Sequence, residues 1–295
     1  MGRHLVALAL CLPLLVACGG DAATPPESTS SETSTTSDPS ASASGTAGSG
    51  DQTIDVDGAQ VATSCSGPED SDGPTVVLLA GMPDPLTTFA DLQASIAQSA
   101  RVCSYDRLGE GTSSPPADQQ SLADIATFLD KVLAAQGIDG DVLLVGHSLG
   151  GLVAAQFAQQ YQDRTAGLLL LDATPPSMVQ AILTLIPDTA TDIAAAVRGE
   201  MLALSTGENP EKLVYQGEAI GSVGDVPLVA IRHGQPIFAQ VPTYGEGIEQ
   251  AWVSGQDTWP TLSSDGTLLV AESSGHYIYR DQPDLVLEQV TALLD

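Results

Sequence analysis

Short apolar runs alternate along this chain with segments in which apolar residues recur every three or four positions. The runs cover residues 75–79, 101–105, 142–145, 167–171, 227–231 and 266–271. Their length and their lack of polar residues predict strands buried on both faces, as in a parallel sheet. Residues 53–64 alternate more weakly and predict an antiparallel ribbon ahead of these strands.

Helical spacing between the strands completes the predicted architecture. It is clearest at 122–133, which begins with a capping signal formed by Ser121 and Asp124. A last helix is expected to begin near Pro283, because proline suits the first turn of a helix. Strands that alternate with helices predict an α/β fold, with a mostly parallel central sheet and helices on both faces.

Residues 174–224 interrupt this alternation. They contain helix-like stretches at 178–186, 193–204 and 212–220 and no strand-like run. A helical insertion after the strand at 167–171 would lie over the carboxyl ends of the strands, where open α/β sheets bind ligands. We therefore expect residues 174–224 to form a cap, the alternative being a connector that does not touch the substrate.

The first 18 residues have the features of an export signal. Arg3 precedes an apolar stretch at 5–16, which is too short to span a bilayer comfortably. The ending, Leu15 to Cys18, resembles the lipobox of bacterial lipoproteins. That resemblance implies that Cys18 is lipidated and that the protein is exported and anchored to the cell membrane. A plain secretory signal with an incidental cysteine is the alternative.

Residues 19–51 are rich in Ser, Thr, Ala, Gly and Pro, and they offer little apolar surface to bury. Such a segment does not recover the entropy that ordering costs, so it is expected to be a disordered tether. A flexible chain of about 30 residues has a root-mean-square reach of roughly 30 Å. The folded domain is then expected over residues 52–295, the size of one large α/β domain.

The chain carries 37 acidic residues against 9 Lys and Arg. An excess of this sign repels nucleic acid and anionic lipid headgroups, so neither is expected as a partner. Membrane association is therefore expected to depend on the lipid at Cys18.

Cysteine usage also fits export. Of the four cysteines, Cys11 and Cys18 lie in or at the end of the signal segment, which leaves Cys65 and Cys103 in the domain. A single pair in an oxidising compartment is most simply a disulfide, and two buried thiols are the alternative. No cysteines and histidines have metal-ligand spacing, so no metal is expected.

A candidate nucleophile lies between the run at 142–145 and a segment of small residues at 150–158. The sequence there is Gly146-His147-Ser148-Leu149-Gly150. A Gly-x-Ser-x-Gly turn between a buried strand and a helix is the setting in which a serine becomes an exposed, strained nucleophile. Ser148 as a simple helix cap is the alternative.

Four stretches together resemble the α/β-hydrolase superfamily over residues 53–295. They are 79–83, the segment Tyr105 to Ser113, the turn at 146–151, and Ser274-Gly275-His276-Tyr277 with Asp281-Gln282-Pro283 after it. The resemblance implies the α/β-hydrolase fold with a helical cap, and an esterase or lipase-like hydrolase with a catalytic triad and no cofactor. It also strengthens the expected disulfide, because Cys65 and Cys103 would lie on neighbouring strands.

By this resemblance His276 is the base that activates Ser148, and a carboxylate should orient its ring. Most of the superfamily has that acid after the strand that ends here at Ile231, but 232–238 contains no carboxylate. Some members take it from the preceding strand, which predicts Asp172. The alternatives are Glu246, Glu249 and Asp257.

The backbone amides of Met82 and Leu149 are expected to form the oxyanion hole. Asp106 and Arg107 are expected to close a loop beside the turn. The predicted function is a serine hydrolase that cleaves small or medium carboxylic esters through an acyl-enzyme. An amide or peptide hydrolase with the same triad, or a catalytically silent binding protein of this fold, are the alternatives. The oligomeric state is left open.

Overall fold

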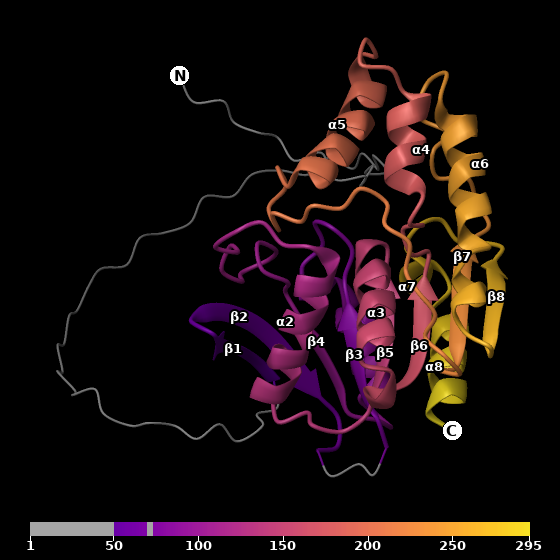
Figure 1. The fold of residues 1–295 in the computed structure, drawn as a ribbon. Coiled ribbons are helices and arrows are strands. Elements are labelled where there is room, and N and C mark those ends of the chain that lie inside the picture. The colour runs from indigo at the N-terminus through magenta and orange to yellow at the C-terminus, as the bar shows by residue number, and fades with distance from the viewer. Residues whose placement is uncertain (1–49, 70–72) are drawn as a thin grey trace, which may run out of the picture. The chain divides into compact units, whose positions relative to one another are not determined.

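A computed structural model describes residues 50–69 and 73–295. The central sheet in this part of the chain has the strand order β1-β2-β4-β3-β5-β6-β7-β8 (Figure 1). The first two strands are antiparallel to their neighbours, and β3 to β8 are parallel. The strands are β1 (Gly50–Val56), β2 (Ala59–Ser66), β3 (Thr75–Leu79), β4 (Val102–Tyr105), β5 (Val142–His147), β6 (Thr165–Leu171), β7 (Leu228–His233) and β8 (Gly266–Ala271). The predicted α/β fold with a mostly parallel sheet is thus confirmed.

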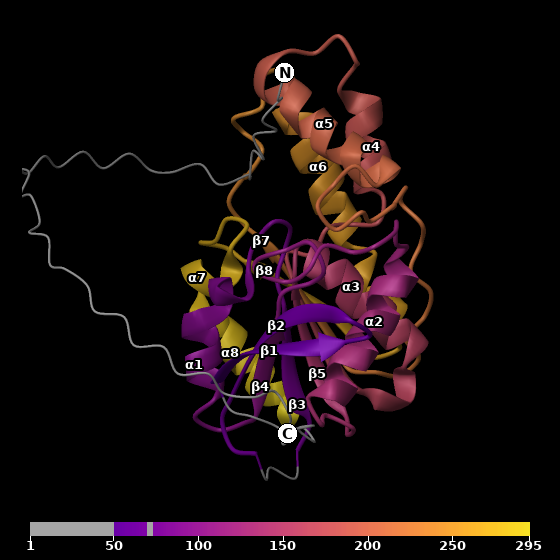
Figure 2. The same ribbon diagram turned by 90° about the vertical axis from the view of Figure 1, so that its left-hand side faces the viewer.

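Helices cover both faces of this sheet, because alternate residues of each buried strand point to opposite sides (Figure 2). Val77 and Leu79 of β3 pack on the side of α2 and α3, while Val76 and Leu78 pack on the side of α1 and α8. The helices are α1 (Ala90–Ile96), α2 (Leu122–Ala135), α3 (Leu149–Gln160), α4 (Met178–Leu185), α5 (Asp192–Thr206), α6 (Gly245–Gln256), α7 (Ile278–Asp281) and α8 (Pro283–Leu294). The capping box at Ser121 and Asp124 is present, and α8 begins at Pro283 as predicted.

A separate apolar cluster lies beyond the carboxyl ends of the strands, where α4, α5 and α6 pack together (Figure 1). Met178 and Ile182 of α4 contribute to it, with Val197 of α5 and Trp252 of α6. Two of these helices lie in residues 174–224, for which a cap is expected. The third, α6, follows β7 and was not part of that expectation.

The helix-like stretch at 212–220 is not a helix, so that prediction is wrong. Residue 213 instead forms an isolated bridge with Gln120. The Gln120 amide donates to the Lys212 carbonyl at 3.0 Å, and its carbonyl accepts from Val214 at 2.9 Å. This pairing and the burial of Glu211 keep the residues around position 213 out of a helix, which overrides the helical pattern.

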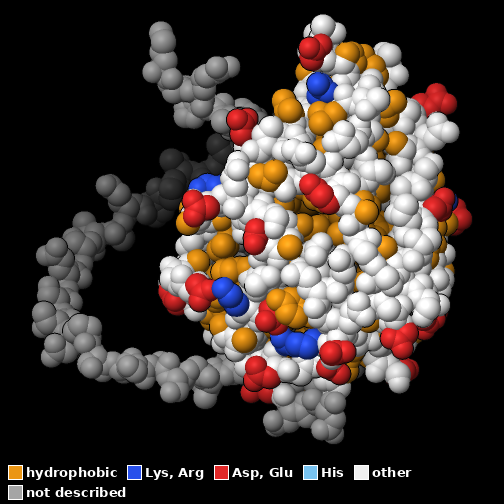
Figure 3. All heavy atoms as spheres, in the orientation of Figure 1, with side chains coloured by type: hydrophobic (Ala, Val, Ile, Leu, Met, Phe, Trp, Pro, Cys, Tyr) orange, Lys and Arg blue, Asp and Glu red, His pale blue; other side chains and the backbone are white. Residues whose placement is uncertain are grey.

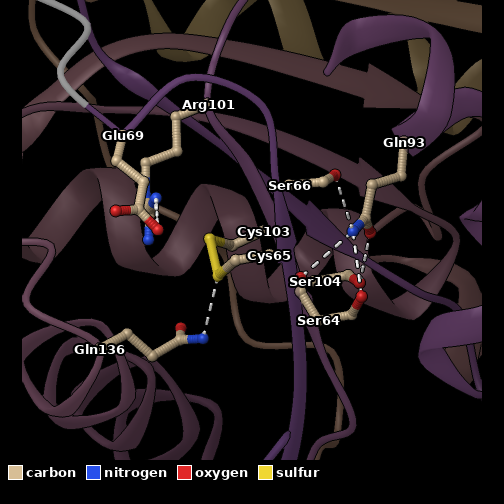
Figure 4. The surroundings of a disulfide bond; sticks show 9 residues. All are labelled: Ser64, Cys65, Ser66, Glu69, Gln93, Arg101, Cys103, Ser104 and Gln136. Carbon is tan, nitrogen blue, oxygen red and sulfur yellow. Dashed lines mark hydrogen bonds and ion pairs between the residues drawn. A yellow bond between two sulfur atoms is a disulfide. The ribbon is translucent and has the colours of Figure 1, made fainter. Parts of the chain in front are cut away.

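The predicted disulfide is present. Cys65 and Cys103 lie directly opposite each other on the antiparallel pair β2 and β4, and their sulfurs are bonded (Figure 4). Beside the bond, the Gln93 side chain donates to Ser64 and accepts from Ser104 at 2.7 Å. The disulfide therefore fastens the antiparallel edge to the parallel part of the sheet.

The export signal at 1–18, Cys18 and nearly all of the tether at 19–51 lie outside the described residues; β1 begins at Gly50, two residues before the expected domain. Within the described ranges, no helix combines the length and the apolar character that a membrane span needs. Figure 3 shows acidic side chains spread over one face with few basic ones among them, as the composition implies.

Candidate active site

Ser148 lies in the sharp turn between β5 and α3, in a backbone conformation that side chains rarely adopt, with φ 51° and ψ −121°. The turn is possible because the residues two positions before and after Ser148 are glycines. A Cβ on Gly146 would lie 2.6 Å from the Gly150 carbonyl oxygen, and one on Gly150 would lie 2.1 Å from that of Leu79. The Ser148 hydroxyl is half-buried and lies 3.3 Å from the Thr174 hydroxyl. Strain of this kind is maintained where the surrounding structure enforces it, often at active sites.

His276 lies in the loop after β8 and is held by Asp172, which follows β6. The distance from His276 Nδ1 to Asp172 Oδ2 is 2.7 Å. Asp172 is fully buried and has a φ of 43°, and its amide donates to the Ile231 carbonyl at 2.7 Å. Because β5, β6, β7 and β8 are consecutive neighbours in the sheet, the residues that follow them gather at one edge.

Asp172 accepts more hydrogen bonds than His276 alone supplies. The Trp252 indole donates to Oδ1 at 3.0 Å, and the His233 amide donates to the same oxygen at 3.2 Å. Burial alone would raise the pKa of Asp172, but the hydrogen bonds and charges of His233 and His276 outweigh it and hold the pKa well below its usual value. Asp172 is therefore an ionised acceptor throughout the neutral range.

The sequence places His233 after a strand but does not favour it over His276 as the base, and it predicts no other role for it. It is the last residue of β7, and its ring lies between Asp172 and Glu249, with Nε2 2.6 Å from Glu249 Oε1. Glu249, considered as an alternative acid, therefore binds His233, whereas Glu246 and Asp257 are exposed. His233 ends the strand after which most of the superfamily places its acid, and that position is the signal that could have drawn attention to it.

His147 packs behind His276, with their ring centroids 4.5 Å apart. Its Nε2 lies 3.0 Å from the His276 carbonyl oxygen, which can only accept, so Nε2 carries the proton. Burial, and then the charge of His276, lower the pKa of His147 well below its usual value. His147 is thus neutral, and its hydrogen bond to the His276 carbonyl helps to fix the loop that contains His276.

The loop that contains Met82 lies against the turn. A Cβ on Gly81 would lie 3.0 Å from the Ser148 Cβ, so only glycine fits there without a shift. Leu149 is the first residue of α3, and the amides of a first helical turn have no partner inside the helix. The Met82 amide thus belongs to the loop that packs against Ser148, and the Leu149 amide belongs to the residue that directly follows Ser148.

A buried ion pair between Arg107 and Glu211 contacts the loop that contains Met82. Arg107 donates to Glu211 through two nitrogens, at 2.8 and 2.7 Å, and also donates to the carbonyls of Ala80 and Gly81. Glu211 belongs to the segment after α5 and is completely buried. Arg107 therefore ties the insertion after β6 to the loop beside Ser148.

Glu110 lies in the same buried cluster. Burial, and then the negative charge of Glu211, raise the pKa of Glu110 to about 8. Its Oε1 has no hydrogen-bond partner among the residues described here. Arg107 thus forms an ion pair with Glu211 and lies near Glu110, whose raised pKa keeps that carboxyl group protonated at neutral pH.

Asp106 closes the neighbouring loop. Its carboxylate accepts from the Leu86 amide at 2.6 Å and from the Thr112 amide at 2.9 Å. This matches the structural role expected for it. In residues 50–69 and 73–295, no group of three His, Cys, Asp or Glu side chains is arranged to hold a metal ion.

Residues 74–258 match the family described as the α/β hydrolase fold. The chain belongs to the α/β-hydrolase fold family. An uncharacterized protein of Mycobacterium tuberculosis is 39% identical over 101 residues, which are 34% of this chain and 29% of that protein. The chain thus matches less than a third of the length of the first curated relatives, and their whole-protein activities do not transfer by that match.

Solved structures of hydrolases share the fold. A bacterial membrane phospholipase A has a TM-score of 0.59 at 18% identity, and the match covers 84% of this chain and 86% of that one. A thermophilic esterase from Thermogutta terrifontis has a TM-score of 0.60 at 18% identity, covering 83% of this chain and 100% of that one. The family match and these neighbours agree on the fold of the chain.

Proposed function

We propose that this protein is a serine hydrolase that cleaves carboxylic esters of small or medium size through an acyl-enzyme. The observation that carries the proposal is the 2.7 Å contact between His276 and a buried, ionised Asp172, at the same sheet edge as the strained Ser148. A serine hydroxyl becomes an effective nucleophile only when a base removes its proton. That base must in turn be held in one tautomer.

The proposed reaction starts when the Ser148 hydroxyl leaves Thr174 and turns toward His276 Nε2. Oγ attacks the ester carbonyl while its proton passes to Nε2, and Asp172 stabilises the imidazolium through Nδ1. The C–O bond to the leaving alcohol then breaks, and Nε2–H protonates that alcohol. Water then attacks the acyl carbon while its proton passes to His276 Nε2. The bond between the acyl carbon and Ser148 Oγ breaks, Nε2–H returns the proton to Oγ, and the acid is released. No cofactor takes part in these steps.

The amides of Met82 and Leu149 would stabilise the negative oxygen of both tetrahedral intermediates. Donors that are held in place before the reaction pay no reorganisation cost when the charge develops. The contact of Arg107 with the carbonyls of Ala80 and Gly81 supports this role, since it restrains the loop that carries the Met82 amide. Esters are proposed over amides because the fold neighbours include an esterase and a phospholipase A.

We further propose that the protein is exported and held on the bacterial cell membrane through lipid at Cys18. The support is the residue pattern that ends at Cys18, with the polar segment 19–51 after it. The Cys65–Cys103 bond agrees with an oxidising compartment.

A covalent serine-directed probe tests the mechanism. Fluorophosphonate should label the wild-type protein and should not label Ser148→Ala, and hydrolysis of a short-chain p-nitrophenyl ester should fall by at least about 10⁴-fold in the variant. Ser254→Ala, an exposed serine on α6, is the matched control and should retain both. Labelling without ester turnover would favour an amide or peptide substrate. Folded wild type that takes no label would favour the silent binding protein.

A further inference from the structure

The His233 ring is enclosed by two carboxylates that come from different parts of the chain. Its Nδ1 lies 2.8 Å from both oxygens of Asp172, and its Nε2 lies 2.6 Å from Glu249 Oε1. The side chain is only 1% exposed, so water does not separate it from either partner. Every nitrogen of this ring therefore faces an acceptor at hydrogen-bond distance.

A neutral imidazole cannot satisfy this arrangement. It has one N–H, so its second nitrogen would direct a lone pair at a carboxylate oxygen. The proton on that contact must come from the ring or from a protonated carboxyl group.

Both carboxylates already accept from other donors, which favours their ionised forms. Asp172 accepts from Trp252 and His276. Glu249 Oε2 accepts from the amides of Ile237 at 2.9 Å and Phe238 at 3.2 Å. The remaining place for the proton is the His233 ring.

We propose that His233 is an imidazolium that bridges Asp172 and Glu249, and that it is a positioning residue which sets both the geometry and the net charge of the acid facing His276. The inference deepens the proposed hydrolase function and rests on it for its catalytic consequence. Burial alone would lower the pKa of His233, but its bonds to Asp172 and Glu249 raise it, in agreement with a charged ring.

The charges around the ring explain why Glu249 is needed. Beside His276, an imidazolium with Asp172 alone would form a neutral pair, and the acid could then do little to stabilise a protonated His276. With Glu249 the three groups carry one net negative charge, as a lone aspartate would. The other charged residues around this strand end are Arg232, which donates to the His233 carbonyl at 2.9 Å, and the exposed Glu272, which follows β8 with its backbone beside Gly234.

The bridge also connects the cap to the reaction centre. Glu249 and Trp252 are both on α6, one turn apart, and Trp252 belongs to the apolar cluster with α4 and α5. Glu249 hydrogen-bonds to the His233 ring, and Trp252 donates directly to Asp172. Movement of α6 would therefore change the hydrogen bonds of the acid.

The ring state can be measured on the full-length protein by nitrogen-15 NMR, since the chain has only 4 histidines and each can be assigned by substitution. In the wild type, His233 should carry protons on both nitrogens from pH 6 to pH 8. In Glu249→Gln the pH at which the His233 ring loses one of these protons should fall by at least about one unit. Glu246→Gln, an exposed residue on the same helix, should leave it unchanged. A singly protonated wild-type ring at pH 7 would overturn the proposal.

Turnover provides a readout that a purely structural role would not give. Glu249→Gln removes a negative charge, so the acid limb of kcat/KM should move to lower pH. His233→Gln removes a positive charge, so the same limb should move to higher pH. Equal shifts, or no shift, in the two variants would contradict the charge assignment. If Ser148→Ala kept full activity while the His233 ring was doubly protonated, the hydrolase mechanism would fail and the bridge would stand.

Discussion

Replacing Glu110 with glutamine tests the buried cluster beneath the loop of Met82. Glu110 is 4% exposed and faces Arg107 and Glu211. Its pKa rises from 4.5 to about 8 in the folded protein, so the folded state holds a proton that the unfolded state releases between these values. The contribution of Glu110 to the free energy of unfolding is fully present below pH 4.5 and is lost as the pH rises toward 8. A pKa raised from 4.5 to about 8 sets an upper limit of about 5 kcal/mol on this loss in the free energy of unfolding, and relaxation of the buried site lowers the actual loss.

Glutamine has the shape of the protonated acid and does not ionise, so Glu110→Gln should escape this loss. Urea unfolding should show that the stability of the variant relative to the wild type rises between pH 5.5 and pH 8, by up to about 3 kcal/mol. Glu208→Gln, an exposed control in the segment after α5, should show no such trend. A stability difference between wild type and Glu110→Gln that stays constant over this range would refute the reasoning.

Three further predictions address the acid, the disulfide and the anchor. Asp172→Asn should lower kcat by about 10⁴-fold, because the amide no longer holds His276 in the right tautomer; steady-state ester hydrolysis measures this, and a near-normal rate would exclude Asp172 as the acid. Replacing both Cys65 and Cys103 with alanine should lower the free energy of unfolding by about 4 kcal/mol for a bond that spans 38 residues; an unchanged urea midpoint would contradict that loop-closure estimate. Cys18→Ser should move the protein from the membrane fraction to the soluble fraction, and retention in the membrane fraction would disprove lipidation at this position.

Much of the fold could be predicted because its signals are local. The apolar run at 142–145 is buried wherever it lies in a parallel sheet, so its composition alone indicates a central strand. Gly146 and Gly150 mark the turn because no side chain fits there. The stretch at 212–220 shows where this reasoning fails. Its helical pattern competes with pairing to a loop some 90 residues earlier, and such pairing leaves no local signal.

The candidate site likewise contains residues that the sequence indicated and residues whose partners only the folded structure reveals. The sequence indicated Ser148 and His276 through motifs and Asp172 through its position after a strand; their catalytic roles remain predictions. It did not indicate His233, because a histidine at a strand end looks the same whether it meets two carboxylates or none. Its partner Glu249 is 16 residues away and reaches it only because α6 folds back over the sheet.

By itself, then, the sequence determined the strands of the sheet, the strained turn and the cysteine pair, since each depends on a few neighbouring residues and on their tendency to be buried. Only the tertiary structure decided which charges meet. Arg107 with Glu211 and His233 with Glu249 join segments that are distant along the chain. Their energies arise from burial and from distances below 3 Å, and neither is defined until the chain has folded.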